Sequence, residues 1–460
     1  MAIGLRRPWQ AVDLNDLVRL FPPPPEFFET AYFASPEEIE RVQLARLRER
    51  ALTAYQVPFF RRRWDDAKWN PRDLRTIDDL WRAPTYTIED IRHSIEENPP
   101  WGDYQGVTPD RARQEPMRIY MSGGTTGASR PTFYTQWDRE VHAILTARVH
   151  FAMGVRPGDV VLNSWLYGTH NGAFGIDEGL YRWLNCVILT TSTGTVTATE
   201  KQIELAMQYS AASVLATGDY LLRLADVARS MGLDPIEDLG LKALATIGDP
   251  APLEQTFGRP SMRAYGFHEV GWIAVECPAR QGLHIFEDAV IVQIVDPDTG
   301  ERVPDGELGS ICVTEIYKTG SPQFRYNVQD LSYLYPREQC ACGSWLRRMA
   351  PFAGRGDNMV KLRGINVWPE AIGDVLRTVP NTGEDYFVRA VREGSRDELI
   401  ASVVSDLAED NFTAIQREAE GRLRDRLGVA IAVKVVKSGE LDELTEIRTS
   451  PKPKRFRDER

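Results

Sequence analysis

Short apolar segments alternate with helical stretches through the middle of the chain, and this alternation constrains the fold more than any other feature. Residues 159–168, 186–191, 241–248 and 261–267 have the length and character of buried strands, and residues 199–216 show helical spacing. Strands that alternate with helices pack as a sheet covered by helices. The sequence therefore predicts an α/β fold.

Other segments add a β-rich part and an N-terminal helix. Residues 289–303 and 306–317 are apolar runs, and the sequence PDTG within the first predicts the turn of a hairpin. Residues 35–57 have helical spacing, with Ser35 as the cap and Glu38 three residues later. We therefore expect a β-rich part beside the parallel sheets, and a helix before both.

The C-terminal region reads as a separate module. Residues 388–405, 411–428 and 430–437 suggest extended chain, an amphipathic helix and a strand, which together indicate a compact α+β unit. A chain of 460 residues is also long for one core. We expect residues 1–356 to form a large domain and residues 357–460 a small, mobile one.

Charge and composition exclude several classes of protein. The net charge of −11 disfavours nucleic-acid binding, although the tail KPKRFRDER is locally basic. No apolar run approaches the roughly 20 residues that cross a bilayer, and the N-terminus has no secretory pattern. Five cysteines, an odd number, fit a reducing compartment. We expect a cytoplasmic protein that binds neither nucleic acid nor membrane.

A loop rich in glycine and hydroxyl residues offers a site for phosphate. It lies within YMSGGTTGASRPTFYT at 120–135, where glycines let N–H groups converge on an anion and hydroxyls add donors. The Walker A pattern fails, because Ala128 and Ser129 follow Gly127. On residues alone, an ordinary turn remains the alternative to a phosphate site.

Several motifs together resemble one superfamily. SGGTTG at 122–127 is similar to the phosphate loop of adenylate-forming enzymes, which include acyl-CoA synthetases, luciferases and nonribosomal adenylation domains. YGFHE at 265–269, RYNVQDL at 325–331 and GRGDNMVKLRGINVWP at 354–369 resemble its later motifs in the same order. Coincidence explains such an ordered series poorly, and the resemblance covers essentially the whole chain.

Further segments resemble the phenylacetate-CoA ligase branch of this superfamily. They are AYQVPFFRRRWD at 54–65, YGTHNG at 167–172, GLHIFED at 282–288, a cysteine pair before the hinge, and a K-x-x-R ending at 452–455. This resemblance implies a large domain that binds ATP and an acid, and a small domain that rotates after the first step.

The resemblance also implies roles for single residues. Glu269 would hold Mg²⁺, Lys452 would supply charge at the α-phosphate with Lys454 as its competitor, and Asp357 would be the hinge. The implied catalytic residues are Lys452, Glu269 and Thr126; those for ATP are Ser122, Gly123, Gly124, Thr125, Thr126, Gly127, Gly248, Asp249, Tyr265, Gly266, Asp330 and Arg355; those for the acid are Tyr167, His170, Phe267 and His268.

Each of these roles has an ordinary alternative. Glu269 could cap a helix or pair with an arginine, and Asp330 could belong to an Asx-turn. The basic tail around Lys452 could be solvated, and His170 could be a histidine without a ligand. On the residues themselves these alternatives stay open.

Three positions depart from the motifs of the branch. Arg130 stands near the place of a lysine, and either replaces its charge or faces solvent. Asn327 and Gln329 replace arginines, and His170 replaces an aromatic residue. Because an imidazole can hydrogen-bond a ring hydroxyl or amino group, His170 is the candidate residue for specificity. The three departures together indicate a substrate or acceptor unlike phenylacetate and CoA.

Cysteine and histidine residues form a candidate metal site. Cys277, His284, Cys340 and Cys342 supply ligand types that suit tetrahedral Zn²⁺, and some relatives in the branch carry a structural zinc. Buried free cysteines are the alternative reading, because C-x-C spacing is less common than C-x₂-C. Cys186 and Cys312 lie in apolar runs and are expected in the core.

The expected function is ATP-dependent activation of an aromatic carboxylic acid to an acyl-adenylate, with pyrophosphate release and transfer to CoA. One alternative is an aryl-adenylate enzyme that uses an amine or another acceptor. The other is a homologue that binds nucleotide without catalysis. The expected partners are the small acid, ATP with Mg²⁺, and CoA or an amine, and a homodimer stays open.

Overall fold

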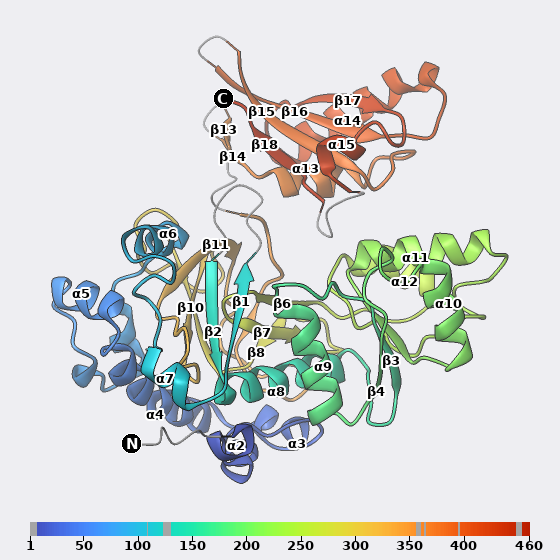
Figure 1. The fold of residues 1–460 in the computed structure, drawn as a ribbon. Coiled ribbons are helices and arrows are strands. Elements are labelled where there is room, and N and C mark those ends of the chain that lie inside the picture. The colour runs from blue at the N-terminus through green and yellow to red at the C-terminus, as the bar shows by residue number, and fades with distance from the viewer. Residues whose placement is uncertain are drawn as a thin grey trace. The chain divides into compact units, whose positions relative to one another are not determined.

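A computed structural model describes residues 7–107, 109–122, 130–355, 360–362, 365–393, 396–447 and 453–460. The chain forms two compact units (Figure 1): a larger one of Met1–Val328 and Tyr333–Pro351, and a smaller one of Gln329–Ser332 and Phe352–Arg460. The predicted boundary at 356/357 lies outside the described residues, so the two assigned domain roles stay predictions.

Helices dominate the first hundred residues of the larger unit. They are α1 (Pro8–Ala11), α2 (Leu14–Leu20), α3 (Glu26–Glu29), η1 (Ala31–Phe33), α4 (Pro36–Ala54), α5 (Pro58–Asp66), η2 (Pro71–Asp73), η3 (Ile77–Arg82) and α6 (Ile88–Glu97). α4 begins as predicted, because Ser35 Oγ accepts from Glu38 N and the Glu38 carboxylate accepts from Ser35 N. The apolar sides of these helices join the main core of the unit.

A hairpin and a parallel sheet follow. The hairpin strands are β1 (Met117–Ser122) and β2 (Arg130–Thr135), after α7 (Pro109–Gln114). The sheet has the order β4-β3-β5 and consists of β3 (Val160–Asn163), β4 (Val187–Thr190) and β5 (Ser213–Leu215). Its helices are α8 (Gln136–Ala152), α9 (Gly172–Trp183), α10 (Thr199–Gln208), α11 (Gly218–Ser230) and α12 (Pro250–Phe257).

The predicted strand at 241–248 is wrong. That segment is extended and largely buried, but it makes only single bridges, Leu244 to Ser261 and Ile247 to Thr217. An apolar run of strand length marks burial, and burial alone does not supply a neighbouring strand. The segment instead closes a core formed with α10, α11 and α12.

Two antiparallel sheets complete the larger unit, and the α/β class with a β-rich part is confirmed. One has the order β12-β8-β7-β6, from β6 (Ala264–Phe267), β7 (Gly271–Glu276), β8 (Leu283–Ile285) and β12 (Arg348–Met349). The other has the order β11-β10-β9, from β9 (Val290–Val295), β10 (Gly309–Glu315) and β11 (Tyr326–Ser332), of which Gln329–Ser332 belong to the smaller unit. The predicted turn after β9 is present, since Gly300 N donates to Asp296 O.

The smaller unit is an α+β module with its own core. Its main sheet has the order β17-β16-β15-β18 and consists of β15 (Tyr386–Glu393), β16 (Arg396–Val404), β17 (Ala432–Val436) and β18 (Phe456–Asp458). The other elements are β13 (Val360–Leu362), β14 (Ile365–Val367), α13 (Pro369–Leu376), η5 (Glu409–Asn411), α14 (Phe412–Leu427) and α15 (Asp442–Thr445). Among the described helices of both units, none is long and apolar enough to cross a membrane.

Candidate active site

The β1–β2 hairpin carries the predicted phosphate loop. Ser122 and Arg130 are register partners at the end of the hairpin where residues 123–129 connect the two strands, so this connection starts and ends at neighbouring backbone positions. The predicted phosphate ligands Gly123, Gly124, Thr125, Thr126 and Gly127 lie outside the described residues. Ser122 is buried, and its hydroxyl has no hydrogen-bond partner among the described residues.

Glu269 sits in the turn between β6 and β7 and faces the end of this hairpin. Arg130 Nη2 donates to Glu269 Oε1 at 2.9 Å, and the two side chains are only 11% and 10% exposed. The solvent-facing alternative for Arg130 is therefore wrong, whereas the arginine pairing considered for Glu269 is present. One carboxylate and one guanidinium stand together at the entrance to the phosphate loop.

The turn itself is tight and closely packed. Val270 N donates to Phe267 O at 3.2 Å, and Gly271 follows with φ +86. A Cβ on Gly271 would lie 2.4 Å from His142 Cδ2, so only glycine fits this backbone against α8. Burial lowers the pKa of His142 to about 3, so this imidazole is neutral at neutral pH.

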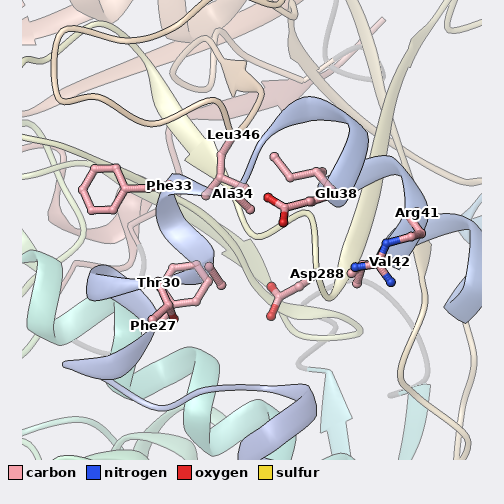
Figure 2. Close-up of a pocket in the computed structure, with 11 residues that line it drawn as sticks. Phe27, Thr30, Phe33, Ala34, Glu38, Arg41, Val42, Asp288 and Leu346 are labelled. Atoms are coloured by element: carbon pink, nitrogen blue, oxygen red, sulfur yellow. The ribbon is translucent and has the colours of Figure 1, made fainter.

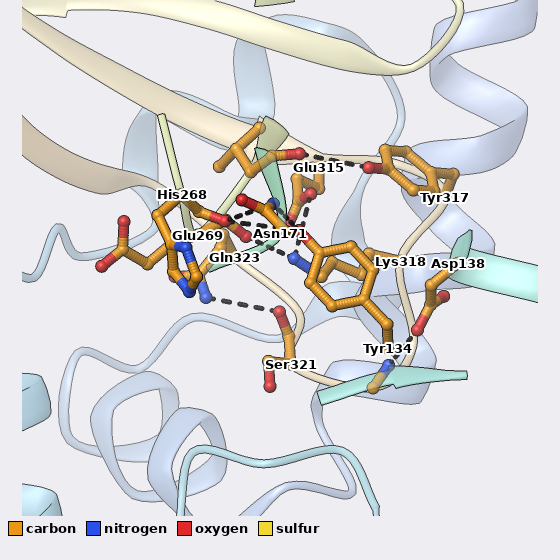
Figure 3. A network of polar contacts seen from close by, with 12 residues as sticks. Tyr134, Asp138, Asn171, His268, Glu269, Glu315, Tyr317, Lys318, Ser321 and Gln323 are labelled. Atoms are coloured by element: carbon orange, nitrogen blue, oxygen red, sulfur yellow. Dashed lines mark hydrogen bonds and ion pairs between the residues drawn. The ribbon is translucent and has the colours of Figure 1, made fainter. Parts of the chain in front are cut away.

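Buried donors hold the backbone of this turn, a role that the sequence did not indicate even for Tyr134 and Asn171, which lie within recognised motifs. Tyr134 and Asn171 donate to the carbonyl of His268, Lys318 donates to the carbonyl of Glu269, and Tyr317 donates to that of Val270 (Figure 3). These donors come from β2, the start of α9 and the segment after β10. No motif spacing connects such distant positions.

The predicted acid-binding residues fall into two groups. His170 and His268 lie edge to face with ring centroids 6.2 Å apart. Phe267 instead packs on Tyr265 and Tyr326, at 6.2 and 6.0 Å. Tyr265, Phe267 and Tyr326 therefore form one aromatic cluster, and His170 and His268 form a second pair of rings.

His268 has an unused ring atom. Its Nε2 is buried and lacks a hydrogen-bond partner among the described residues, and burial lowers the pKa of the ring to about 4. A neutral ring of this kind can donate or accept one more hydrogen bond. The Tyr167 hydroxyl is already engaged within the protein, because it donates to Asp177 at 2.6 Å and accepts from Asn163 at 2.7 Å.

The remaining predicted nucleotide residues lie in both units. Gly248 fits closely against Gly218, and Asp249 caps α12 by accepting from Ala251 N at 3.2 Å. In the smaller unit, Arg355 Nη1 donates to Asp330 Oδ1 at 3.2 Å, and the two residues also form a backbone bridge. The structure thus brings together the two residues predicted to reach the ribose.

The predicted lysine and hinge lie outside the described residues, at 452 and 357. Lys454, the competing lysine, is described and is engaged within its own unit. Its ammonium forms an ion pair with Glu446 at 2.5 Å, and its N–H donates to Thr445 O at 2.7 Å.

Cys277, His284, Cys340 and Cys342 converge. Their ligand atoms all lie within 4.8 Å of one another, with 3.8 Å between the sulfurs of Cys277 and Cys340 and 3.5 Å between Cys342 Sγ and His284 Nε2. A tetrahedral zinc with Zn–S bonds near 2.3 Å would separate its sulfurs by ~3.8 Å. The four groups fit a closed structural site without an open position.

Hydrogen bonds around Cys342 favour its own thiolate, whereas the hydrogen bond that it shares with Cys277 raises the pKa of the Cys277 thiol. Donation from Cys277, then from His284 and Tyr32, lowers the pKa of Cys342. The Tyr32 hydroxyl lies 3.3 Å from Cys342 Sγ, although the two are 310 residues apart in sequence. Tyr32 was absent from the predicted cluster, because no local pattern links η1 to the cysteine pair.

A cavity of about 430 Å³ lies beside η1 (Figure 2). It is lined mainly by residues of the N-terminal helices, together with Asp288 and Leu346 from later in the chain. Its described lining includes none of the residues predicted to bind nucleotide, acid or metal. The lining residues are Phe27, Thr30, Ala31, Phe33, Ala34, Glu38, Ile39, Arg41, Val42, Asp288 and Leu346.

Known proteins resemble the chain over most of its length. Residues 364–460 match the AMP-binding enzyme C-terminal domain. The phenylacetate-coenzyme A ligase of Thermus thermophilus is 31% identical over 431 residues, which cover 88% of this chain and 94% of that protein. The enzyme of the same name from Pseudomonas putida is 31% identical over 423 residues, which cover 89% and 92%.

Solved structures share the fold. A 2-hydroxyisobutyryl-CoA ligase in its postadenylation state, in complex with 2-HIB-AMP, aligns with a TM-score of 0.82 at 25% identity, over 93% of this chain and 91% of that one. ATP-bound MatB from Rhodopseudomonas palustris aligns with a TM-score of 0.55 at 17% identity, over 70% and 64%. The second likeness concerns the fold alone.

Proposed function

The chain belongs to the phenylacetate-coenzyme A ligase family of adenylate-forming enzymes, and from this premise we propose that Arg130 and Glu269 form the phosphate end of its adenylation site. The reaction of the chain is activation of a carboxylic acid to an acyl-adenylate, followed by transfer to CoA. The predicted family, fold class and acid–thiol ligase activity are confirmed.

The two half-reactions set the demands on the site. A carboxylate oxygen of the acid attacks the α-phosphorus of ATP, and the bond to pyrophosphate breaks. The CoA thiol then attacks the acyl carbonyl, loses its proton, and AMP leaves. The first step brings two anionic groups together, so cations must neutralise the charge that develops on phosphate.

The ion pair of Arg130 with Glu269 is the observation that supports this assignment. Glu269 offers a hard carboxylate oxygen, the ligand type that Mg²⁺ prefers, and Mg²⁺ bound there would neutralise phosphate charge. Arg130 already compensates that carboxylate and directly follows the phosphate loop in sequence. We therefore assign Arg130 the role of counter-ion to Glu269 until metal and nucleotide bind.

For the acid, we propose an aromatic carboxylate with a ring hydroxyl or amino group. His170 and His268 present neighbouring imidazoles, and His268 Nε2 still has a hydrogen bond to make. A buried polar atom without a partner is costly, so a ligand group that pairs with it gains affinity. A plain phenyl ring has no atom to offer.

An ATP–pyrophosphate exchange screen tests the function and the acid together. We expect exchange with hydroxylated or aminated aromatic acids, and thioester formation when CoA is added. The variant His170→Phe should reduce the preference for the substituted acid over its unsubstituted analogue by about tenfold, the size of one lost hydrogen bond. His93→Phe, on the exposed face of α6, is the control.

The screen also separates the alternatives. Exchange without thioester, but with product when an amine or hydroxylamine is supplied, would favour a different acceptor. Absence of exchange with every acid would favour a binding protein without catalysis. An unchanged preference in His170→Phe would contradict the role of His170 while leaving adenylation in place.

We also propose a structural Zn²⁺ on Cys277, His284, Cys340 and Cys342, supported by the ligand separations. We further propose that the smaller unit rotates about Asp357 between the two half-reactions, as the resemblance to adenylate-forming enzymes implies. The homodimer and the cytoplasmic location stay predictions.

A further inference from the structure

The turn that carries Glu269 is held by the protein interior. Hairpin turns commonly expose their carbonyl groups to water. Here three successive carbonyls, those of His268, Glu269 and Val270, each accept from a buried side chain. A bulge between β6 and β7 at Tyr265 and Gly266 precedes the turn, and bulges redirect the side chains that follow them.

The first carbonyl has two donors. Tyr134 Oη lies 3.3 Å and Asn171 Nδ2 lies 3.2 Å from the carbonyl oxygen of His268, and Asn171 also donates to Tyr134 Oη at 3.2 Å. Tyr134 is fully buried in β2, the strand that begins with Arg130. The same strand therefore supplies the ion-pair partner of Glu269 and a support for its backbone.

The second carbonyl, that of Glu269, accepts from a lysine inside the protein (Figure 3). Lys318 is 1% exposed, its ammonium lies 4.1 Å from the centre of the Tyr134 ring, and Glu315 lies 3.7 Å away. Burial raises the pKa of Glu315 to about 8 and lowers that of Lys318. A buried lysine is expensive unless its hydrogen bonds are used, and one of them is used on this turn.

The third carbonyl, that of Val270, accepts from Tyr317 Oη at 3.2 Å. Tyr317 and Lys318 are adjacent, so the segment after β10 holds two successive peptide groups of the turn. Residues that only filled space would not need to aim donors at consecutive carbonyls. The donors to the His268 carbonyl, together with Lys318, hold the two peptide planes that flank Glu269, and Tyr317 holds the next plane along the chain.

We propose that Tyr134, Asn171, Tyr317 and Lys318 are positioning residues, which hold the 268–270 turn so that the Glu269 carboxylate stays oriented for the divalent cation of the reaction. This inference rests on the proposed role of Glu269 and extends it to four residues that do not touch the cation. Loss of one donor should let the carboxylate sample other orientations and so weaken cation binding.

The test compares two buried tyrosine hydroxyls. Tyr134→Phe removes a donor to the turn and keeps the ring beneath Lys318. Tyr86→Phe removes a similarly buried hydroxyl that donates to Gln323 Oε1 at 2.5 Å and not to a carbonyl of the turn. For each variant, free Mn²⁺ is measured by electron paramagnetic resonance with a non-hydrolysable ATP analogue, together with the melting temperature and the Mg²⁺ dependence of pyrophosphate exchange.

We expect Tyr134→Phe to weaken Mn²⁺ binding by about fivefold, the effect of one lost hydrogen bond, with exchange restored at saturating Mg²⁺. Tyr86→Phe should lower the melting temperature similarly and leave the Mn²⁺ affinity unchanged. Lys318→Met should have the larger effect on Mn²⁺, and Lys318→Arg should recover part of it. If the Lys318 variants do not fold, the Mn²⁺ affinities of Tyr134→Phe and Asn171→Ala still test the inference.

Equal Mn²⁺ affinities in Tyr134→Phe, Asn171→Ala and Tyr86→Phe would overturn the inference. A wild-type protein that neither binds Mn²⁺ with nucleotide nor exchanges pyrophosphate with any acid would instead overturn the proposed function. The two failures are distinct, because the first leaves wild-type exchange intact.

Discussion

Arg130 and Glu269, which we propose to form the phosphate end of the site, are each about nine-tenths buried and form an ion pair with one another. Removing one partner of such a pair leaves a charge that is poorly solvated. We therefore expect Arg130→Gln to lower the free energy of unfolding by about 2 kcal/mol or more, measured by urea titration. We also expect tighter Mn²⁺ binding without nucleotide, because the Glu269 carboxylate then lacks its counter-ion.

Arg130→Lys keeps the charge and is the matched control for this prediction. It should retain most of the stability and stay close to wild type in Mn²⁺ affinity, although a lysine lacks the planar fork of the guanidinium. If Arg130→Gln bound Mn²⁺ no better than Arg130→Lys, the guanidinium would not compete with the cation for Glu269.

Sequence reasoning reached Glu269 through a motif but did not decide its surroundings. Two residues that contact Glu269, Arg130 and Lys318, lie far from it in the chain, and Lys318 belongs to no recognised motif. The pairing of Glu269 with an arginine was considered, yet which arginine depends on how the β1–β2 hairpin approaches the β6–β7 turn. That approach is tertiary information.

At the scale of elements, the β7–β8 and β8–β12 pairings explain why the four candidate metal ligands meet. Cys277 follows β7, His284 lies in β8, and β12 pairs Arg348 with His284, which brings the 340–342 loop alongside. The ligand types could be read from the sequence, and the register could not. The strand predicted at 241–248 is wrong for the same kind of reason. The apolar composition of the run indicated burial but carried no information about a partner strand.

This cluster makes a prediction about metal content. Protein washed with a weak chelator should retain about one zinc per chain, because a closed four-ligand site releases metal slowly. Cys342→Ser should lose the metal and melt at a lower temperature, while pyrophosphate exchange persists below the new melting point. Elemental analysis and thermal unfolding measure the two effects.

Cys186→Ser is the control for this experiment, because Cys186 is buried elsewhere and its thiol donates only weakly to backbone carbonyls. It should keep the zinc. Metal-free wild-type protein with unchanged stability would show that the four residues are an ordinary buried cluster.

At the scale of the whole molecule, the chain forms two units with separate cores, and the candidate catalytic groups are distributed over both. Glu269 and the β1–β2 hairpin belong to the larger unit. Asp330, Arg355 and the C-terminal lysines belong to the smaller one. A division of this kind allows the smaller unit to serve one half-reaction and leave the other unaffected.

The two C-terminal lysines test that division. Lys454 is tied to Glu446 within the smaller unit, and each side chain is about one third exposed, so the pair contributes little to stability. Because this ammonium is occupied within its own unit, we expect Lys452 to supply the charge at the α-phosphate. Lys452→Ala should slow pyrophosphate exchange by about 10²- to 10³-fold, as loss of a group that stabilises transition-state charge does. Lys454→Ala should change the exchange rate by less than about threefold.

A synthetic acyl-adenylate added with CoA separates the two half-reactions. Lys452→Ala should still form thioester at nearly the wild-type rate, since no phosphoryl bond breaks in that half-reaction. Loss of exchange in Lys454→Ala alone would reverse the assignment, and loss of thioester formation in Lys452→Ala would show that this lysine serves both half-reactions.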